Sequence, residues 1–206
     1  MSPVIGVMLM LVVTVILAAA VSSTSSGLMK STDKAPTAVF DVKLSLGDDA
    51  VGMPGVTTDS LSIKQVTGDS IPTSDLKIIT VNPNTNGVQT IETVPGVINH
   101  RTGWAANGAP WLNDGSWSPA AFGNYTLKSG IVMVADSWSN YNNPNATTWN
   151  ETAGLYDGFD YSTGEIDALH SMIANYDSIE EGDWVTIKIV HMPTQKVIFQ
   201  SDVEAK

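Results

Sequence analysis

An uncharged apolar run at the start of the chain constrains its fold most. Residues 3–21 read PVIGVMLMLVVTVILAAAV, and no side chain in residues 1–29 carries a charge. As an α-helix these nineteen residues would rise about 28 Å, close to the hydrocarbon thickness of a bilayer. A helix that is apolar all round must be surrounded by apolar material. We therefore expect residues 1–30 to form a helix that is buried either in lipid or in a bundle of identical helices.

Three interpretations of this segment compete. A cleaved signal peptide requires a basic region before its apolar core, and the segment has none. A plain membrane anchor fits the length, but Lys30 and Lys34 place basic residues on one side only. A filament subunit whose basic leader has been removed accounts for an uncharged segment at the start. Pro3 at the first helical position, after a possible Ser2 cap, suits all three.

The amino-acid sequence of the segment favours the third interpretation, a processed filament subunit. Ser2–Val7 reads SPVIGV, Met8–Met10 reads MLM, and Thr14–Ala19 reads TVILAA, and together these resemble the N-terminus of archaeal type IV pilins. The resemblance implies cleavage by a prepilin peptidase, residence in the membrane before assembly, and packing in a filament core by a pilus assembly machine. The candidate filament-core residues are Pro3, Val4, Ile5, Val7, Met8, Leu9, Leu11, Val12, Val15, Ile16 and Leu17.

One position departs from the bacterial relatives of that family. They generally carry glutamate at the fifth mature position, where it can meet the terminal amine of a neighbour, whereas this chain has Ile5 and no acid before Asp33. Axial register must then come from side-chain packing and from contacts between outer domains. The segment also differs from archaellins, which lack the SPVIG pattern, so a pilus is expected rather than a rotating filament.

The rest of the chain has the alternation and turns of short β-strands. Strands are predicted at Thr37–Leu46, Ser60–Val66, Leu76–Val81, Val88–Val94, Gly130–Ala135, Trp184–His191 and Lys196–Val203. We expect an α+β protein, with the long N-terminal helix followed at residues 31–206 by a mainly antiparallel, immunoglobulin-like β-sandwich. A helix is predicted from the capping-box spacing of Ser162 and Glu165, with Ile166, Leu169, Ile173 and Tyr176 on one face.

Residues 99–160 differ in composition and are interpreted as a long insertion into the sandwich. They are rich in Trp, Asn, Gly and Ser, and include Trp104, Trp111, Trp117, Trp138 and Trp149. We interpret these indoles mainly as anchors for the insertion or for subunit contacts. Stacking on sugar faces is the alternative.

Three glycosylation sequons lie in the same region. They begin at Asn124, Asn145 and Asn150, and each has the N-x-[ST] pattern. Clustering in a polar segment of a secreted protein favours N-linked glycans on at least one of them, which would shield an exposed surface. Glycosylation of pilin-like surface proteins in archaea supports the same expectation by resemblance.

No motif in the sequence supports catalysis or a cofactor. His100, His170 and His191 are scattered, cysteine is absent, and we detect no hydrolase, metalloprotease or nucleotide-binding pattern. The net charge of −11 opposes binding to nucleic acid, because acidic surfaces repel phosphates. Asp157, Asp160 and Glu165 do not have EF-hand spacing, so a solvated acidic turn is expected rather than a metal site.

Assembly is therefore the expected function. We expect a homo-oligomeric, extracellular cell-surface pilus used for adhesion. Two alternatives remain open at this stage: a membrane-anchored module that binds carbohydrate or cations without polymerising, and a minor or tip pilin acting as an adhesin.

Overall fold

The computed structural model describes part of the chain. The described residues are 10, 14, 34–50, 53–97, 99–101, 106–116, 119–137, 149–153, 155–156 and 167–206. The chain divides into two compact units, Met1–Ala35 and Pro36–Lys206. In the first unit Met10 and Thr14 are helical, and the eleven candidate filament-core residues lie outside the described residues. Among the described residues, no helix is long and apolar enough to cross a membrane.

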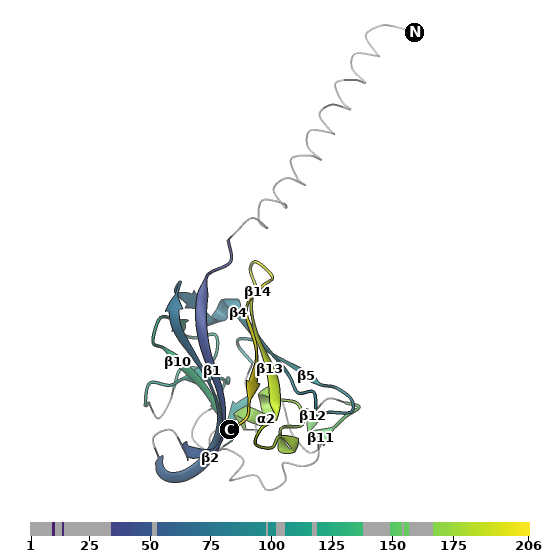
Figure 1. Cartoon of the computed structure of the whole chain (residues 1–206). Helices are drawn as coiled ribbons and strands as arrows, with labels where there is room; N and C mark the ends of the chain where they lie inside the picture. The colour runs from purple at the N-terminus through teal and green to yellow at the C-terminus, as the bar shows by residue number, and fades with distance from the viewer. Residues whose placement is uncertain are drawn as a thin grey trace. The chain divides into compact units, whose positions relative to one another are not determined.

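The second unit is built mainly from antiparallel strands (Figure 1). The strands are β1 (Ala38–Ala50), β2 (Met53–Gly68), β3 (Ile71–Pro72), β4 (Leu76–Val81), β5 (Thr90–Thr93), β6 (His100–Arg101), β7 (Ala106–Asn107), β8 (Trp111–Leu112), β9 (Thr126–Leu127), β10 (Val132–Asp136), β11 (Trp149–Asn150), β12 (Leu155–Tyr156), β13 (Trp184–His191) and β14 (Lys196–Glu204). The helical elements are the 3₁₀ turn η2 (Thr73–Asp75), the α-helix α2 (Ala168–Met172) and the 3₁₀ turn η4 (Tyr176–Ser178).

The first large sheet has the strand order β1-β2-β10-β8. In β1 the side chains alternate as the sequence predicts, since Phe40 and Leu44 are buried while Asp41 and Lys43 are exposed. The β1–β2 ladder is long and runs from Ala38 opposite Gly68 to Ala50 opposite Met53, with shifts in register along it. Both predicted strands are therefore present and extend further than their apolar alternation.

The second large sheet has the strand order β14-β13-β4-β5. Strands β4 and β13 occupy the predicted ranges, and their inward residues, such as Ile78 and Ile187, are fully buried. The pairing is antiparallel throughout this sheet. The salt bridge from Lys77 Nζ to Glu92 Oε2, at 3.0 Å, joins β4 to β5 on the exposed face.

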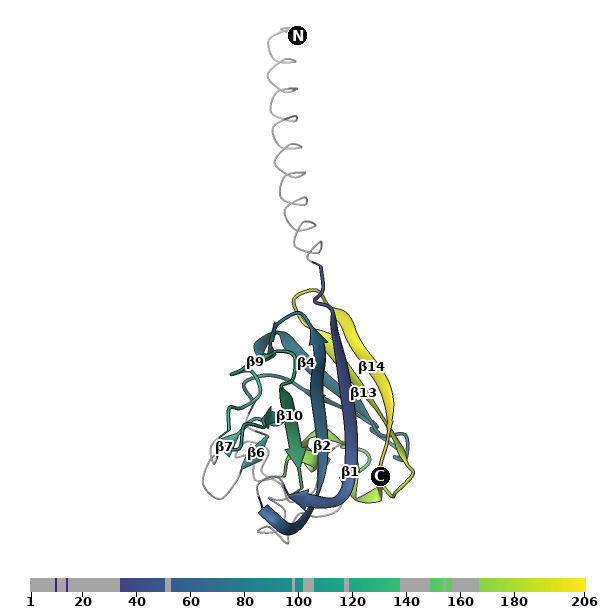
Figure 2. The ribbon, with the colours of Figure 1, turned by 60° about the vertical axis from the view of Figure 1, so that its left-hand side comes forward.

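A single hydrophobic core lies between the inner faces of the two sheets. It contains Leu61, Ile63 and Met133 from the first sheet and Leu76, Ile78, Val185 and Ile187 from the second. Figure 2 shows the two sheets with β1 beside β14. The domain is thus a β-rich, antiparallel structure with two sheets around one core, and its immunoglobulin-like connectivity stays a prediction.

Part of the Trp- and Asn-rich region belongs to this framework. β10, which lies within residues 99–160, pairs with β2 on one side and with β8 on the other. Trp111 in β8 packs against the core. Buried Thr73 holds the loop that precedes β9 by two hydrogen bonds. Its Oγ1 donates to the carbonyl of Tyr125 at 2.6 Å and accepts from the amide of Gly123 at 3.0 Å.

The predicted C-terminal helix is shorter than its apolar spacing indicates. Ser162, Glu165 and Ile166 lie outside the described residues, and the described helix α2 covers only Ala168–Met172. Its N-cap is Asp167, whose carboxylate accepts from the amide of His170. Tyr176 does not continue the helix, since Asn175 adopts a left-handed conformation with φ of 47° and starts the turn η4. The prediction that Tyr176 shares the α-helix was therefore wrong.

Candidate assembly segment and surface sites

The described sequons differ in their exposure. Asn124 is exposed in a turn just before β9, and Thr126 of the same sequon is also exposed. Asn150 is partly buried, and its Oδ1 accepts hydrogen bonds from the amides of Thr152 and Ala153, at 3.1 and 2.9 Å. Asn145 lies outside the described residues. Because a glycan needs an accessible asparagine, Asn124 is the best-placed described acceptor.

A buried histidine lies between two carboxylates beside α2. The ring of His170 has Nδ1 at 2.5 Å from Asp167 Oδ2 and Nε2 at 2.9 Å from Asp177 Oδ1. Burial by itself lowers the pKa of His170, but hydrogen bonds and charge attraction from Asp167 and Asp177 outweigh it and raise the pKa to about 9. The bond to His170 also holds the pKa of Asp177 below its ordinary value. His170 therefore carries a positive charge at neutral pH.

Tyr176 connects this cluster to the first sheet. Its ring meets that of His170 edge to face, with centroids 5.1 Å apart, and its hydroxyl donates to Asp59 Oδ2 at 2.6 Å. Asp59 Oδ1 in turn accepts from the amide of Gly47 at 2.7 Å. Burial, followed by the hydrogen bond to Asp59, raises the pKa of Tyr176 above its ordinary range. The hydroxyl therefore stays protonated, and the network joins the β1–β2 hairpin to the C-terminal segment.

The sequence did not predict this cluster. The three histidines are scattered in the sequence and indicated no site, whereas His170 has charged partners from two sides. The Asp167-x-x-His170 spacing was the available signal, because an N-cap aspartate lies near the third residue of its helix. Asp177 and Asp59 come from other elements, so no local pattern could have added them. Among the described residues, no group of three or more histidines, cysteines or acids is arranged to hold a metal.

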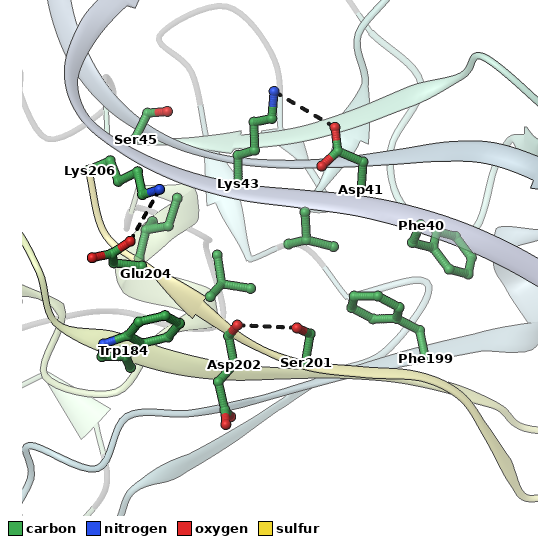
Figure 3. Close-up of a pocket in the computed structure, with 13 residues that line it drawn as sticks. Phe40, Asp41, Lys43, Ser45, Trp184, Phe199, Ser201, Asp202, Glu204 and Lys206 are labelled. Atoms are coloured by element: carbon green, nitrogen blue, oxygen red, sulfur yellow. Dashed lines mark hydrogen bonds and ion pairs between the residues drawn. The ribbon is translucent and has the colours of Figure 1, made fainter.

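A pocket of about 430 Å³ lies along the seam between β1 and β14 (Figure 3). We call it the seam pocket; residues 40–45 of β1, Trp184 of β13, and Phe199, residues 201–204 and Lys206 line it. Its floor is apolar, with Leu44 and Val203 buried at 2% and 7% exposure. Trp184, 52% exposed, stands at the rim. Trp184 lies outside the Trp-rich region, and the sequence pattern indicates no role for it beyond its strand.

The seam pocket is closed at both ends by direct contacts between β1 and β14. At one end the rings of Phe40 and Phe199 meet edge to face, with centroids 5.6 Å apart. At the other end the amide of Lys206 donates to the carbonyl of Leu44 at 3.1 Å, and the amide of Leu46 donates to the carbonyl of Lys206 at 2.6 Å. Between these contacts the two edge strands separate and leave the pocket open to solvent.

Comparison with known proteins gives a match to the first unit and the start of β1. Residues 1–40 match the family model described as archaeal type IV pilin, N-terminal. These residues, which we call the pilin segment, are similar to the N-terminal segment of archaeal type IV pilins. The pilin segment includes all eleven candidate filament-core residues, and the match ends within β1 at Phe40. A search of curated proteins finds no match to the chain.

The match supports a role as a pilin subunit, which belongs to a structural class of proteins rather than an enzymatic one. It covers the apolar run and the start of β1, and does not extend to the rest of the β-domain. The features of that domain, including the seam pocket and the His170 cluster, must therefore be interpreted from their own geometry.

Proposed function

We propose that this chain is the structural subunit of an archaeal type IV pilus. In this proposal many copies polymerise through the helix of residues 1–30 into a cell-surface filament used for adhesion. The single observation that carries the proposal is the family match at residues 1–40. The antiparallel β-domain that follows it is a suitable outer layer, because it has a core of its own.

Assembly would move the helix from lipid into a bundle of its own copies. Lipid tails are as apolar as Leu9 or Val12, so the hydrophobic effect alone does not drive that transfer. Close packing between helices and contacts between outer domains must supply the free energy, together with the assembly machinery that the family resemblance implies. Once the filament is in water, exposing each large aliphatic side chain costs about 1.5–3 kcal/mol. The helix would then hold each subunit firmly in place.

The other parts of the proposal follow from the same placement. The precursor would lie in the membrane until a prepilin peptidase removes its leader. The β-domain would face the outside, where glycans on Asn124, Asn145 or Asn150 shield its surface. Residues 31–206 would form this extracellular domain, with residues 99–160 as its Trp- and Asn-rich part.

The test is a charge placed in the proposed filament core. Val12→Asp should abolish filaments seen by negative-stain electron microscopy, because a carboxylate would have to be buried without a partner. Val12→Leu is the matched control, since it keeps the site apolar, and it should still give filaments. Immunoblotting of membranes must show that both variants are made at similar levels.

Two outcomes would refute the proposal. Normal filaments from Val12→Asp would contradict the packing of this helix in the core. A wild-type chain that stays a single species in the membrane, with no filaments, would favour the non-polymerising anchored module. Counting copies in sheared filaments separates a major subunit from a minor or tip pilin.

A further inference from the structure

We propose that the seam pocket binds a neutral saccharide. The proposal concerns the β-domain alone and holds whether or not the chain polymerises.

The shape of the seam pocket favours a compact ligand over a strand or a helix. An added β-strand would need an edge that continues past the ends of the pocket. The Phe40–Phe199 ring contact closes one end, and the backbone hydrogen bonds of Lys206 to Leu44 and Leu46 close the other. The volume of about 430 Å³ falls in the range of small-molecule sites.

The lining has two kinds of surface, as a sugar ring does. Buried Leu44 and Val203 make an apolar floor, and Trp184 adds a flat indole that is half exposed at the rim. Ser201 lies on the same strand face as buried Val203, but it is exposed and lines the pocket. An aromatic face can receive the C–H face of a sugar, while hydroxyl and carboxylate groups receive its hydroxyls. Figure 3 shows Trp184, Asp202 and Ser201 on the β13–β14 side of the pocket, with Trp184 and Asp202 on the outer face of this ladder and Ser201 on its inner face.

The charges at the rim favour a neutral ligand. Lys43 Nζ lies 3.7 Å from Asp41 Oδ2, and Lys206 Nζ lies 3.1 Å from Glu204 Oε2. Asp202 Oδ1 accepts from the hydroxyl of Thr186 at 2.5 Å. Both cations therefore have an acidic partner close by, and one acid remains in excess. An acidic saccharide would meet this excess negative charge, whereas a neutral saccharide needs only hydrogen bonds.

The experiment measures saccharide binding to the full-length chain in a detergent without sugar groups. Saturation-transfer difference NMR is recorded with maltotriose, cellotriose and mannotriose as neutral probes, and with trigalacturonic acid as the acidic probe. At least one neutral probe should show transfer, and its affinity should fall about tenfold or more in Trp184→Ala. Ser201→Phe, which fills the pocket and keeps the indole, should have the same effect. Val197→Ala, on exposed β14 surface outside the pocket, is the matched control and should bind normally.

Protein made in a host without N-glycosylation separates two sources of the saccharide. Equal binding by glycosylated and glycan-free protein indicates a saccharide from another surface, and binding by glycan-free protein alone indicates that the chain's own glycan fills the pocket. Either result supports a saccharide site. The proposal is overturned if no neutral probe binds, if trigalacturonic acid alone binds, or if both pocket variants bind like wild type. Loss of filaments in those variants without saccharide binding would make the pocket a subunit contact instead.

Discussion

The buried imidazolium of His170 should make the stability of the β-domain fall in mildly alkaline solution. The pKa of His170 is about 9 in the folded chain, against an ordinary value of 6.5. Between these values the folded chain holds a proton that the unfolded chain releases, so the free energy of unfolding decreases as pH rises. The contribution is complete below pH 6.5 and disappears as pH passes 9. Its size is about 3 kcal/mol, at about 1.4 kcal/mol for each pKa unit.

Urea unfolding of the full-length chain in a fixed detergent, followed by tryptophan fluorescence between pH 6 and pH 10, measures this loss. His170→Gln should remove the pH dependence and should be less stable than wild type at pH 6 by a similar amount, because buried Asp167 then lacks its cation. His191→Gln is the matched control: its ring bonds Thr194 at 2.9 Å rather than a carboxylate, so the dependence on pH should remain.

Direct titration tests the cause of the effect. The imidazole carbon and proton NMR signals of His170 should shift with a midpoint near pH 9. A midpoint close to 6.5, or a stability that rises between pH 6 and pH 10, would refute the reasoning. The charged carboxylate of Asp177 also stabilises the folded domain. Because His170 lowers the pKa of Asp177, this stabilisation is lost only when the pH falls below 3.8, the ordinary pKa of the group.

Three further changes test other parts of the structure. Tyr176→Phe should lower the unfolding free energy by about 1.5–3 kcal/mol in urea titrations, because Asp59 loses a hydrogen-bond donor; an unchanged midpoint would contradict this. Gly68→Ala should lower the thermal unfolding midpoint, because φ is 121° there and a Cβ would collide with the backbone of Thr37. Gly115→Ala is the control: this glycine is exposed and has open space around it, so the midpoint should fall less. Asn124→Gln should remove one glycan from the intact mass of protein made in its native host, and an unchanged mass would exclude that sequon.

Local patterns in the sequence were sufficient to place the longer described strands (β1, β2, β4, β5, β10, β13 and β14), whereas the two-residue strands were not predicted. Leu76–Val81 and Trp184–His191 were predicted with their observed bounds, because alternation shows which residues must face a core. β1 and β2 run further than predicted, since their backbone pairing continues to Ala50 opposite Met53. Backbone hydrogen bonds can extend a ladder whatever the apolar pattern of the side chains, and alternation does not report that extension.

Contacts between residues far apart in the sequence could not be predicted from local patterns. In the pairing of β10 with β2, Val132 lies opposite Lys64, and the local sequence of neither strand identifies its partner strand. The same holds for Tyr176 and Asp59, which meet although they are far apart in the sequence. The apolar alternation of β1 and β14 also could not show that these two edges separate between Phe40 and Leu44 to leave a pocket. For the pilin segment, in contrast, the residues SPVIG sufficed to name the family that the comparison then matched.

The arrangement of β1 has a mechanical consequence. The chain enters the β-domain through this strand, so tension on its N-terminal side reaches β1 first, and the case of interest is a pull along the strand. β1 is held along one edge by its long ladder with β2, and along the other by the backbone bonds of Leu44 and Leu46 to Lys206. A pull in this direction shears both sets of bonds together instead of opening them one after another. The domain therefore resists tension that runs along β1 with both edges of that strand.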